Sequence, residues 1–496
     1  MTSCPLSWTT LRLLTLSVTR DLIPLMHDAA CLPFFFASLF LGFCLQPTAI
    51  DCEFTGLSAD PSLDPNLFDT PDDRYRKLRQ SAGQLTICQF GVCTFTRNVS
   101  TDMVPSLSNR YEGKCFTFYL CPRSFSDRKS KKVMINTSSI EFLNDHSFNF
   151  EKWLKQGIPF MNREEEEYLS ELLSSGDIIA EICNERDDRM DQMFGMIDQI
   201  KTFQSSNGGG NGGTGVGGEG EGGDVKDKDG MQILIPFTAS VNQFRNFAMI
   251  KRLRQIFPTF WIRLMNGHLL VKKMQPGDEE EREARDLAYA EEEDQAMEYM
   301  RGFCRVIQTM IDAQKVIVGH NCFTDLVFLH QHLIADLPKR LTAFKQGIRS
   351  LFPMIYDTKH IVMATKKSIP EFKFLRGTGL TELYDQLGVP EYSASFLYNP
   401  VIELMSDENA VGQSFFFVQT TVVMFYVNCH YLFHQSPPRS RNTMPDRMHL
   451  PADLVRNKTA FALKSHFADC ENTFLPSFTA PSPLLFLSFM NLTHQK

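Results

Sequence analysis

Several features that would identify a protein class at once are missing from this sequence. Its thirteen cysteines include no Cys-x-x-Cys pair and no cysteine–histidine ladder, which argues against a structural zinc site. The formal net charge of −8 gives no global attraction to nucleic acid, so RNA contacts would depend on local basic patches. The glycine-rich segment 208–223 lacks a following Gly-Lys-Ser/Thr, which argues against a phosphate-binding loop and favours a flexible linker.

Composition and cysteine usage are typical of a soluble intracellular protein. The chain has 496 residues, enough for two or three domains, and 43% of them are hydrophobic. Unpatterned cysteines indicate reduced, buried thiols, so a cytoplasmic location is expected. Two apolar runs, 29–45 and 415–433, leave membrane association open, at the endoplasmic reticulum or the mitochondrial outer membrane for example. The first run resembles a signal segment or short anchor, the second reads equally well as buried strands, and a nuclear location also stays open.

The most informative motif is Asp51-Cys52-Glu53, which ends a short β-prone apolar run. Residues i and i+2 of a strand project from the same face, so both carboxylates can reach one point. Two hard oxygen ligands suit Mg²⁺, and a pair of such ions can assist phosphodiester hydrolysis. This pattern far more often marks a solvated acid pair at a strand end. Only the surrounding sequence can therefore decide whether Asp51 and Glu53 bind a metal.

A third acid, Asp325, follows a second strand-like segment at 315–319 and the sequence His320-Asn321. Its position at the start of an apolar helix is explained simply by the helix dipole, which favours acids in the first turn. The alternative is that Asp325 faces Asp51 and Glu53 and completes a metal site. His320 alone is best interpreted as a structural histidine.

The segments around these acids resemble the poly(A)-specific ribonuclease (PARN) branch of the DEDD exonuclease superfamily, the deadenylases. Within it, the chain is most similar to the subgroup that trims piRNA precursors. The resemblance covers residues 48–405 and includes ordered landmarks between the acids. These are 50–56, 68–78, 89–95, 157–165, 318–325, 356–359 and 380–383.

The resemblance and the alternation of strand-like and helical segments predict an α/β fold. This is an RNase H-like mixed sheet flanked by helices, with a small inserted α+β domain. The insert occupies the family's nucleic-acid-binding slot but lacks the family's Arg-x-x-x-His signature. The expected organisation is a divergent apolar extension (1–46), a first nuclease part (47–203), a glycine-rich linker (204–228), the insert (229–276), a second nuclease part (277–411) and a divergent C-terminal region (412–496).

The resemblance implies a 3′–5′ exoribonuclease acting on the 3′ end of single-stranded RNA, either poly(A) or a piRNA precursor. Asp51, Glu53 and Asp325 would be the catalytic, metal-binding residues, with two Mg²⁺ ions as cofactors and Mn²⁺ as an alternative. The substrate-binding residues stay unassigned. A DNA-directed nuclease stays open, because the nuclease core does not itself select the sugar. The resemblance also implies that the protein can form a homodimer.

The family's last motif, close to His-Glu-Ala-Gly-Tyr-Asp-Ala, is not found where it is expected. Ser406-Asp407-Glu408-Asn409-Ala410-Val411-Gly412 stands there instead, without the histidine base or a clear fourth acid. Loss of a general base typically lowers a rate by about 10²–10⁴-fold. Impaired catalysis in this chain is therefore one hypothesis, and a catalytically inactive RNA-binding or scaffold protein on the same fold is the alternative function.

Overall fold

The computed structural model describes residues 48–97, 110–125, 132–175, 188–206, 231–240, 242–275, 277–367, 375–387 and 401–405. The described residues divide between two compact units. The residues of unit 1 fall within 1–121, 132–163 and 303–496. Those of unit 2 fall within 122–131 and 164–302. The expected insert, 229–276, lies inside unit 2. The linker segment 208–223, the apolar runs 29–45 and 415–433 and the segment 406–412 lie outside the described residues.

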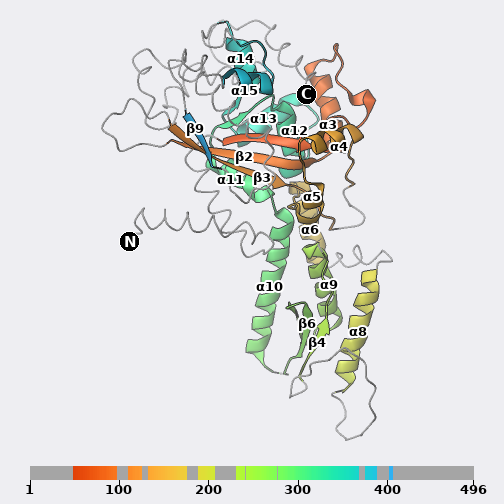
Figure 1. Ribbon diagram of the computed structural model, residues 1–496. Coiled ribbons are helices and arrows are strands. Elements are labelled where there is room, and N and C mark those ends of the chain that lie inside the picture. Colours follow the sequence, from red (N-terminus) through yellow and green to blue (C-terminus); the bar gives the residue numbers. More distant parts are fainter. Residues whose placement is uncertain are drawn as a thin grey trace, which may run out of the picture. The chain divides into compact units, whose positions relative to one another are not determined.

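Unit 1 contains a mixed six-stranded sheet in the order β8-β7-β1-β2-β3-β9. Its strands β2, β3 and β9 are labelled in Figure 1. β1 pairs with β2 and β2 with β3 in antiparallel fashion, whereas β7 runs parallel to β1 and β8 parallel to β7. In the RNase H-like arrangement, three antiparallel strands follow one another and parallel strands are added beside the first of the three. The sheet has this arrangement, so the predicted fold class is confirmed. The strands are Thr48–Phe54 (β1), Ile87–Arg97 (β2), Arg110–Tyr119 (β3), Ile317–Gly319 (β7), Ile355–Asp357 (β8) and Val401–Met405 (β9).

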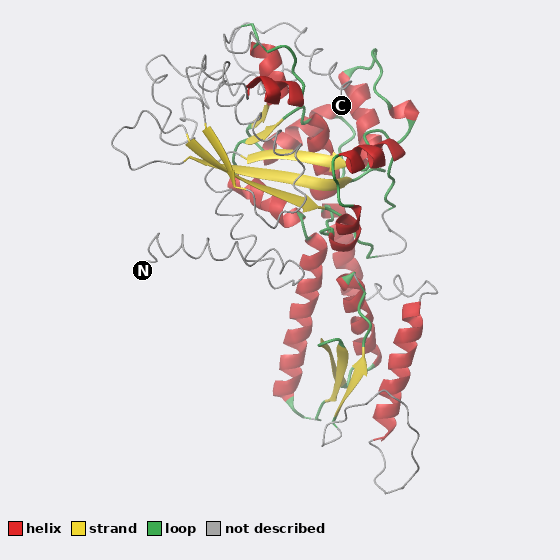
Figure 2. Cartoon of the chain, viewed as in Figure 1, coloured by secondary structure: helices red, strands yellow, loops and turns green. Residues whose placement is uncertain are grey.

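Helices flank this sheet, as expected (Figure 2). The largest apolar cluster joins one face of β1, β2 and β3 to α3, α11, α12 and α13. A smaller cluster around Trp153 joins Tyr119 of β3 to α4 and α5. The helices of unit 1 are Pro71–Ala82 (α3), Thr137–Asp145 (α4), Phe150–Gln156 (α5), Cys304–Ala313 (α11), Phe323–Leu333 (α12), Leu341–Leu351 (α13), Thr358–Thr365 (α14) and Leu380–Leu387 (α15), with a short 3₁₀ turn, η3, at Pro61–Leu63.

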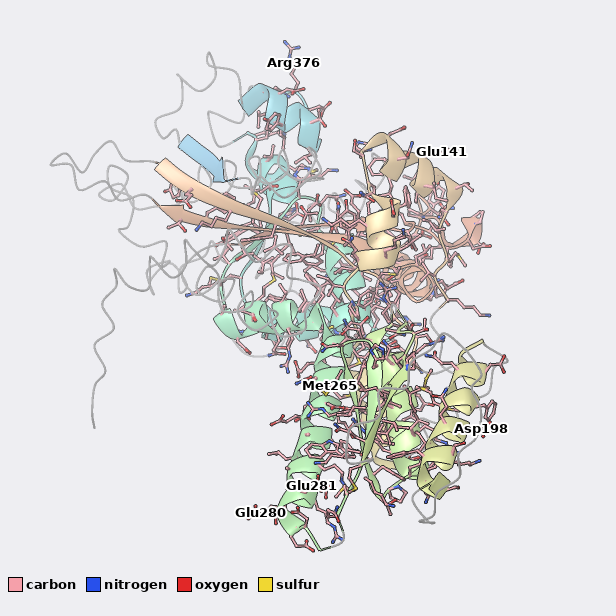
Figure 3. The ribbon with its side chains drawn as sticks, turned by 60° about the horizontal axis from the view of Figure 1, so that its bottom comes forward. Glu141, Asp198, Met265, Glu280, Glu281 and Arg376 are labelled. Carbon is pink, nitrogen blue, oxygen red and sulfur yellow. The ribbon has the colours of Figure 1, made fainter. Side chains whose placement is uncertain are left out.

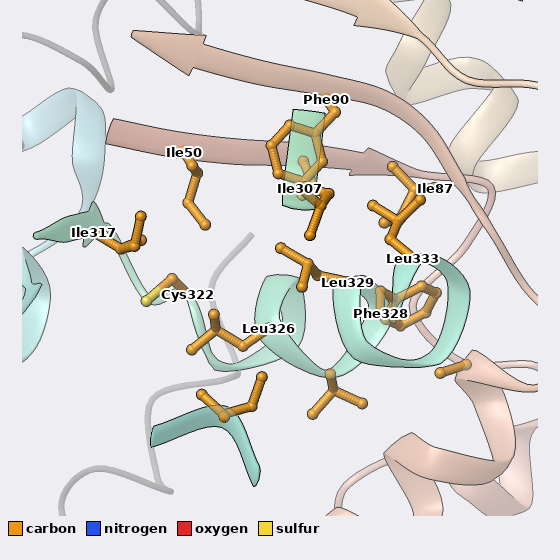
Figure 4. Packing of buried hydrophobic residues seen from close by; sticks show 14 of the residues in the cluster. Ile50, Ile87, Phe90, Ile307, Ile317, Cys322, Leu326, Phe328, Leu329 and Leu333 are labelled. Atoms are coloured by element: carbon orange, nitrogen blue, oxygen red, sulfur yellow. The ribbon is translucent and has the colours of Figure 1, made fainter. Parts of the chain in front are cut away.

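The strand alternation of β1 decides which side chains enter the core. Ile50, Cys52 and Phe54 belong to the large apolar cluster, so Asp51 and Glu53 project from the opposite face of the strand. The helix α12 packs on the core side, where Leu326, Leu329 and Leu333 lie beneath the sheet (Figure 4). Phe328 of the same helix lies 4.5 Å, centroid to centroid, from the ring of Phe54. This packing fixes α12, and with it the first-turn residue Asp325, against β1.

Unit 2 is built on a three-stranded antiparallel sheet in the order β4-β6-β5. Its core is formed by apolar side chains from this sheet and from α8 and α9. Lys272 of β6 forms a 2.6 Å ion pair with Glu281 in the first turn of α10, the helix end labelled in Figure 3. The elements are Arg163–Ser175 (α6), Asp188–Ser206 (α8), Gln232–Pro236 (β4), Gln243–Ile256 (α9), Phe260–Met265 (β5), His268–Lys273 (β6) and Glu279–Arg301 (α10).

Two of the four cations of α9 form ion pairs with acids of α10. Lys251 pairs with Glu293 at 2.6 Å, and the buried Arg254 pairs with Glu292. Arg254 also lies 3.6 Å above the ring of Tyr289 and donates from Nε to the carbonyl oxygen of Ile262 at 2.9 Å. These contacts join α9, β5 and α10 within unit 2 and leave less free positive charge than the sequence Lys251-Arg252-Leu253-Arg254 suggests.

The start of α3 offers a simple test of local stability. Thr70 and Asp73 form a capping box, in which Thr70 Oγ1 accepts from Asp73 N and Asp73 Oδ2 accepts from Thr70 N, each at 3.2 Å. Replacing Thr70 by alanine is expected to lower the free energy of unfolding by about 1 kcal/mol. Urea unfolding measures the change. Gln80→Ala, on the exposed surface of the same helix, should stay within about 0.5 kcal/mol of the parent, and an equal loss in both variants contradicts the capping argument.

None of the helices in the described ranges is both long and apolar enough to cross a membrane.

Candidate active site

The first two predicted site residues lie on β1. Asp51 is buried, at 8% exposure, and Glu53 is partly exposed two residues further along the same face. The strand β2 continues this face at Gly91, which is paired with Asp51, and at Gln89, which is paired with Glu53. Because glycine has no side chain, no side chain of β2 stands directly beside Asp51. Asp51 and Glu53 thus lie on a face that continues across β2 through Gly91 and Gln89, and Asp51 and Gly91 are both buried there.

The third predicted residue, Asp325, reaches the same strand from α12. The strand β7 pairs with β1 only at Thr48 and Ala49, so this edge of β1 has no strand partner beyond that point among the described elements. The carboxylate of Asp325 takes the partner's place, with Oδ1 accepting from the main-chain N–H of Cys52 at 3.0 Å. Asp325 is itself only 5% exposed. The structure therefore brings Asp325 to the residue between Asp51 and Glu53.

The pKa of the Cys52 thiol is affected by all three acids. This pKa is raised well above the ordinary value, first by burial and then by the negative charges of Asp325, Asp51 and Glu53. All three carboxylates therefore lie near enough to this thiol to raise its pKa. Burial and the charge of Glu53 likewise raise the pKa of Cys88 on the neighbouring strand.

The acids do not form a ready-made metal cage. In the part of the chain that the structure describes, no group of three or more His, Cys, Asp or Glu side chains is arranged to hold an ion. Their donor chemistry nevertheless fits Mg²⁺, which is typically bound through one or two carboxylates, water and substrate phosphate oxygens rather than by an all-protein cage. Their role as metal ligands stays a prediction.

Beyond Glu53, polar side chains extend across the sheet. Gln89 of β2 is paired with Tyr119 of β3, and both are buried. Burial raises the pKa of Tyr119, while hydrogen bonds to its oxygen from the Asn149 N–H and from Gln89 lower it. Gln89 and Tyr119 therefore form a fixed polar row that begins at Glu53. This row follows from the strand register, which the sequence pattern alone does not specify.

A further buried carboxylate, that of Asp357, belongs to the segment 356–359, which the sequence marks only as a family landmark. Asp357 ends β8, is 3% exposed, and accepts three main-chain N–H groups with its two oxygens. Its oxygens are thus engaged in holding backbone. An acid between a short apolar strand and Thr358 is the pattern of a helix N-cap, and this signal could have marked Asp357 as structurally important.

His320, predicted to be structural, is buried beside the same segment, and its Nδ1 lies 2.9 Å from Thr358 Oγ1.

The model of the CAF1 family ribonuclease matches residues 47–419. The poly(A)-specific ribonuclease PNLDC1 of Pongo abelii is 31% identical over 353 residues, covering 70% of this chain and 60% of that protein. The pre-piRNA 3′-exonuclease trimmer of Bombyx mori is 26% identical over 341 residues, covering 68% of this chain and 57% of the relative. The chain thus spans less than two thirds of either relative.

Among solved structures, the Mg²⁺- and Mn²⁺-bound form of S. pombe Pop2p is similar, at 12% identity and a TM-score of 0.35. That match covers 85% of this chain and 94% of the Pop2p chain.

Proposed function

Because this chain belongs to the CAF1 family of ribonucleases, we propose that it is a 3′–5′ exoribonuclease that trims RNA 3′ ends by two-metal phosphodiester hydrolysis. The kinship predicted from the sequence is confirmed by the family match, and the relatives include poly(A)-specific ribonucleases named PARN. The observation that carries the proposal to specific residues is the 3.0 Å contact between Asp325 Oδ1 and Cys52 N. It sets a helix-borne acid beside the strand-borne pair Asp51 and Glu53.

In this proposal Asp51, Glu53 and Asp325 hold two divalent ions, Mg²⁺ or Mn²⁺. When bound, such ions activate water and stabilise the charge that develops on the attacking and leaving oxygens. The chain's own contribution is to fix the acids. β1 fixes the spacing of Asp51 and Glu53, and the Cys52 N–H holds one oxygen of Asp325.

The proposed substrate is the 3′ end of single-stranded RNA, with poly(A) and piRNA precursors as the two candidates suggested by the relatives' names. Cytoplasmic location, homodimerisation and attachment to an intracellular membrane stay predictions from the sequence.

A second candidate is a catalytically inactive RNA-binding or scaffold protein on the same fold. The observation in its favour is the segment Ser406–Gly412, which replaces the family's histidine-containing motif. It differs from the first candidate in one measurable respect, because binding would persist while shortening would not occur.

The deciding experiment incubates the full chain with Mg²⁺ and a 5′-labelled single-stranded RNA that ends in oligo(A). Stepwise shortening from the 3′ end that EDTA stops is the expected result. Binding without shortening supports the scaffold candidate, and neither binding nor shortening overturns both. Parallel reactions on the same sequence as DNA, and on RNA with a mixed-sequence 3′ extension, test sugar selectivity and tail preference.

A further inference from the structure

The turn Gly319–Cys322 delivers Asp325 to β1. It begins where β7 ends and leads directly into α12. It is tight, because a Cβ on Gly319 would lie 2.4 Å from Cys322 Cβ. Asn321 has a φ of 58°, in the left-handed region, which asparagine adopts more readily than most residues with a side chain. The turn is also held by contacts from the neighbouring strand β8.

The main contacts that hold the turn come from Asp357 at the end of β8. Its Oδ1 accepts from Asn321 N at 3.1 Å, and its Oδ2 accepts from Cys322 N at 2.9 Å. Oδ1 also accepts from His360 N at 3.1 Å, which caps α14. One carboxylate therefore ties two consecutive amides of the turn to the start of another helix. Cys322, the residue before α12, has no side-chain cap of its own.

The next residue, Thr358, holds the other half of the turn. Its hydroxyl donates to the carbonyl oxygen of Gly319 at 3.2 Å. A hydroxyl has a single proton, so the 2.9 Å contact with His320 requires Nδ1–H of the histidine to donate to Thr358 Oγ1. Thr358 is fully buried. Asp357 and Thr358 together thus bond to all four residues of the turn.

We propose that Asp357, supported by Thr358, is a positioning residue for the active site: it fixes the turn Gly319–Cys322 so that Asp325 reaches Cys52 and the acids of β1. The inference rests on the proposed function for its catalytic meaning, but its structural part can be tested without any activity. Asp357 touches no reacting atom in this scheme and acts only through Asp325. The chain of contacts runs from Asp357 through Cys322 and α12 to Asp325 and the amide of Cys52.

The simpler alternative is that Asp357 only caps α14. Asp357→Asn separates the two roles, because the amide oxygen can replace Oδ1 and keep the bonds from Asn321 and His360. The amide nitrogen cannot accept a hydrogen bond, so the bond from Cys322 N is lost and two donors face each other. Asparagine is as good an N-cap as aspartate, so a pure capping role predicts no change at Cys52.

The primary measurement is residue-resolved hydrogen exchange in the full chain, without metal or RNA. If Asp357 positions Asp325, the Asp357→Asn variant should speed exchange of the Cys52 amide at least tenfold, although residue 357 does not contact it. Thr70→Ala serves as the matched control, since it removes a helix cap in the same unit without touching the turn. Faster exchange at Cys322 with unchanged exchange at Cys52 overturns the proposal.

Kinetics supply the second measurement. The Asp357→Asn variant should lower kcat for RNA trimming at least tenfold with KM changed less than twofold, whereas Thr70→Ala should leave both unchanged. A kcat equal to that of the parent, measured on an active parent, contradicts the proposal. If the parent chain trims no RNA, the proposed function fails while the exchange result still decides the structural inference. Should Asp357→Asn not fold, Thr358→Val removes the neighbouring contacts, and unchanged Cys52 exchange in that variant also counts against the proposal.

Discussion

Replacing Asp51 or Asp325 by asparagine is expected to lower the rate of RNA trimming by about 10²–10³-fold. Each substitution keeps the size of the side chain but removes a negative charge and a preferred oxygen ligand for Mg²⁺. A bound divalent ion contributes several kcal/mol of transition-state stabilisation, and each ~1.4 kcal/mol corresponds to tenfold in rate. Single-turnover assays with the full chain and 5′-labelled RNA measure the loss directly.

The choice of asparagine separates catalysis from folding. The amide oxygen of Asp325→Asn can still accept from Cys52 N, so the variant should unfold at nearly the parent urea concentration. Asp325→Ala instead leaves that buried N–H without its acceptor, at a cost of about 1–3 kcal/mol. Asp312→Asn, on the exposed end of α11, is the control and should retain the parent rate. If both Asp51→Asn and Asp325→Asn trim RNA at the parent rate, the assignment of these acids as catalytic, metal-binding residues is wrong.

The sequence predicts the parts of this site that depend on local pattern. Strand alternation is enough to place Asp51 and Glu53 on one face, whereas Asp325 is assigned to the site only through the family resemblance, because an acid in the first turn of a helix is common. The predicted strand-like segment 315–319 corresponds to β7. The RNase H-like topology came from the family resemblance, because periodicity does not determine strand order.

What the sequence could not provide are contacts between distant residues. Asp357 lies 35 positions from Cys322, and the bond between them depends on β8 packing beside β7. Likewise Gln89 faces Glu53 only because β2 pairs with β1 in one register, with an irregularity between Glu53 and Phe54. A slip of one residue would place Gln89 on the core face instead. Such positions become visible only after tertiary packing is fixed.

The second large effect should come from alkaline pH. Four buried thiols of unit 1, those of Cys52, Cys88, Cys93 and Cys322, have pKa values raised well above normal. Burial is the largest cause in each, because it disfavours the thiolate. Neighbouring groups add to it, namely the carboxylates of Asp325, Glu53 and Asp357 and the thiol of Cys115, whose sulfur lies 2.9 Å from that of Cys93. The folded protein therefore keeps these thiols protonated at pH values where the unfolded chain does not.

The sign of the effect follows from proton release. An unfolded thiol titrates near pH ~8.5, so above that pH the unfolded chain binds fewer protons than the folded one and the free energy of unfolding falls. The contribution is complete below pH ~8.5 and is lost as the pH rises toward the raised folded values. At pH ~9.5 each thiol accounts for about 1.4 kcal/mol, and four account for about 5–6 kcal/mol. Since a domain is stable by only about 5–15 kcal/mol, unit 1 should be close to unfolding there.

Urea unfolding at pH 7.5 and 9.5 measures this loss in a Trp8→Phe, Trp261→Phe background, in which the buried Trp153 reports on unit 1. The upper pH is kept below the titration of tyrosine, because burial also raises the pKa of Tyr75, to about 12, and would add to the effect. Cys93→Ala should reduce the pH-dependent loss by about a quarter, since it removes one of four protons. An unfolding free energy that is the same at both pH values contradicts the protonated state of these buried thiols in the folded protein.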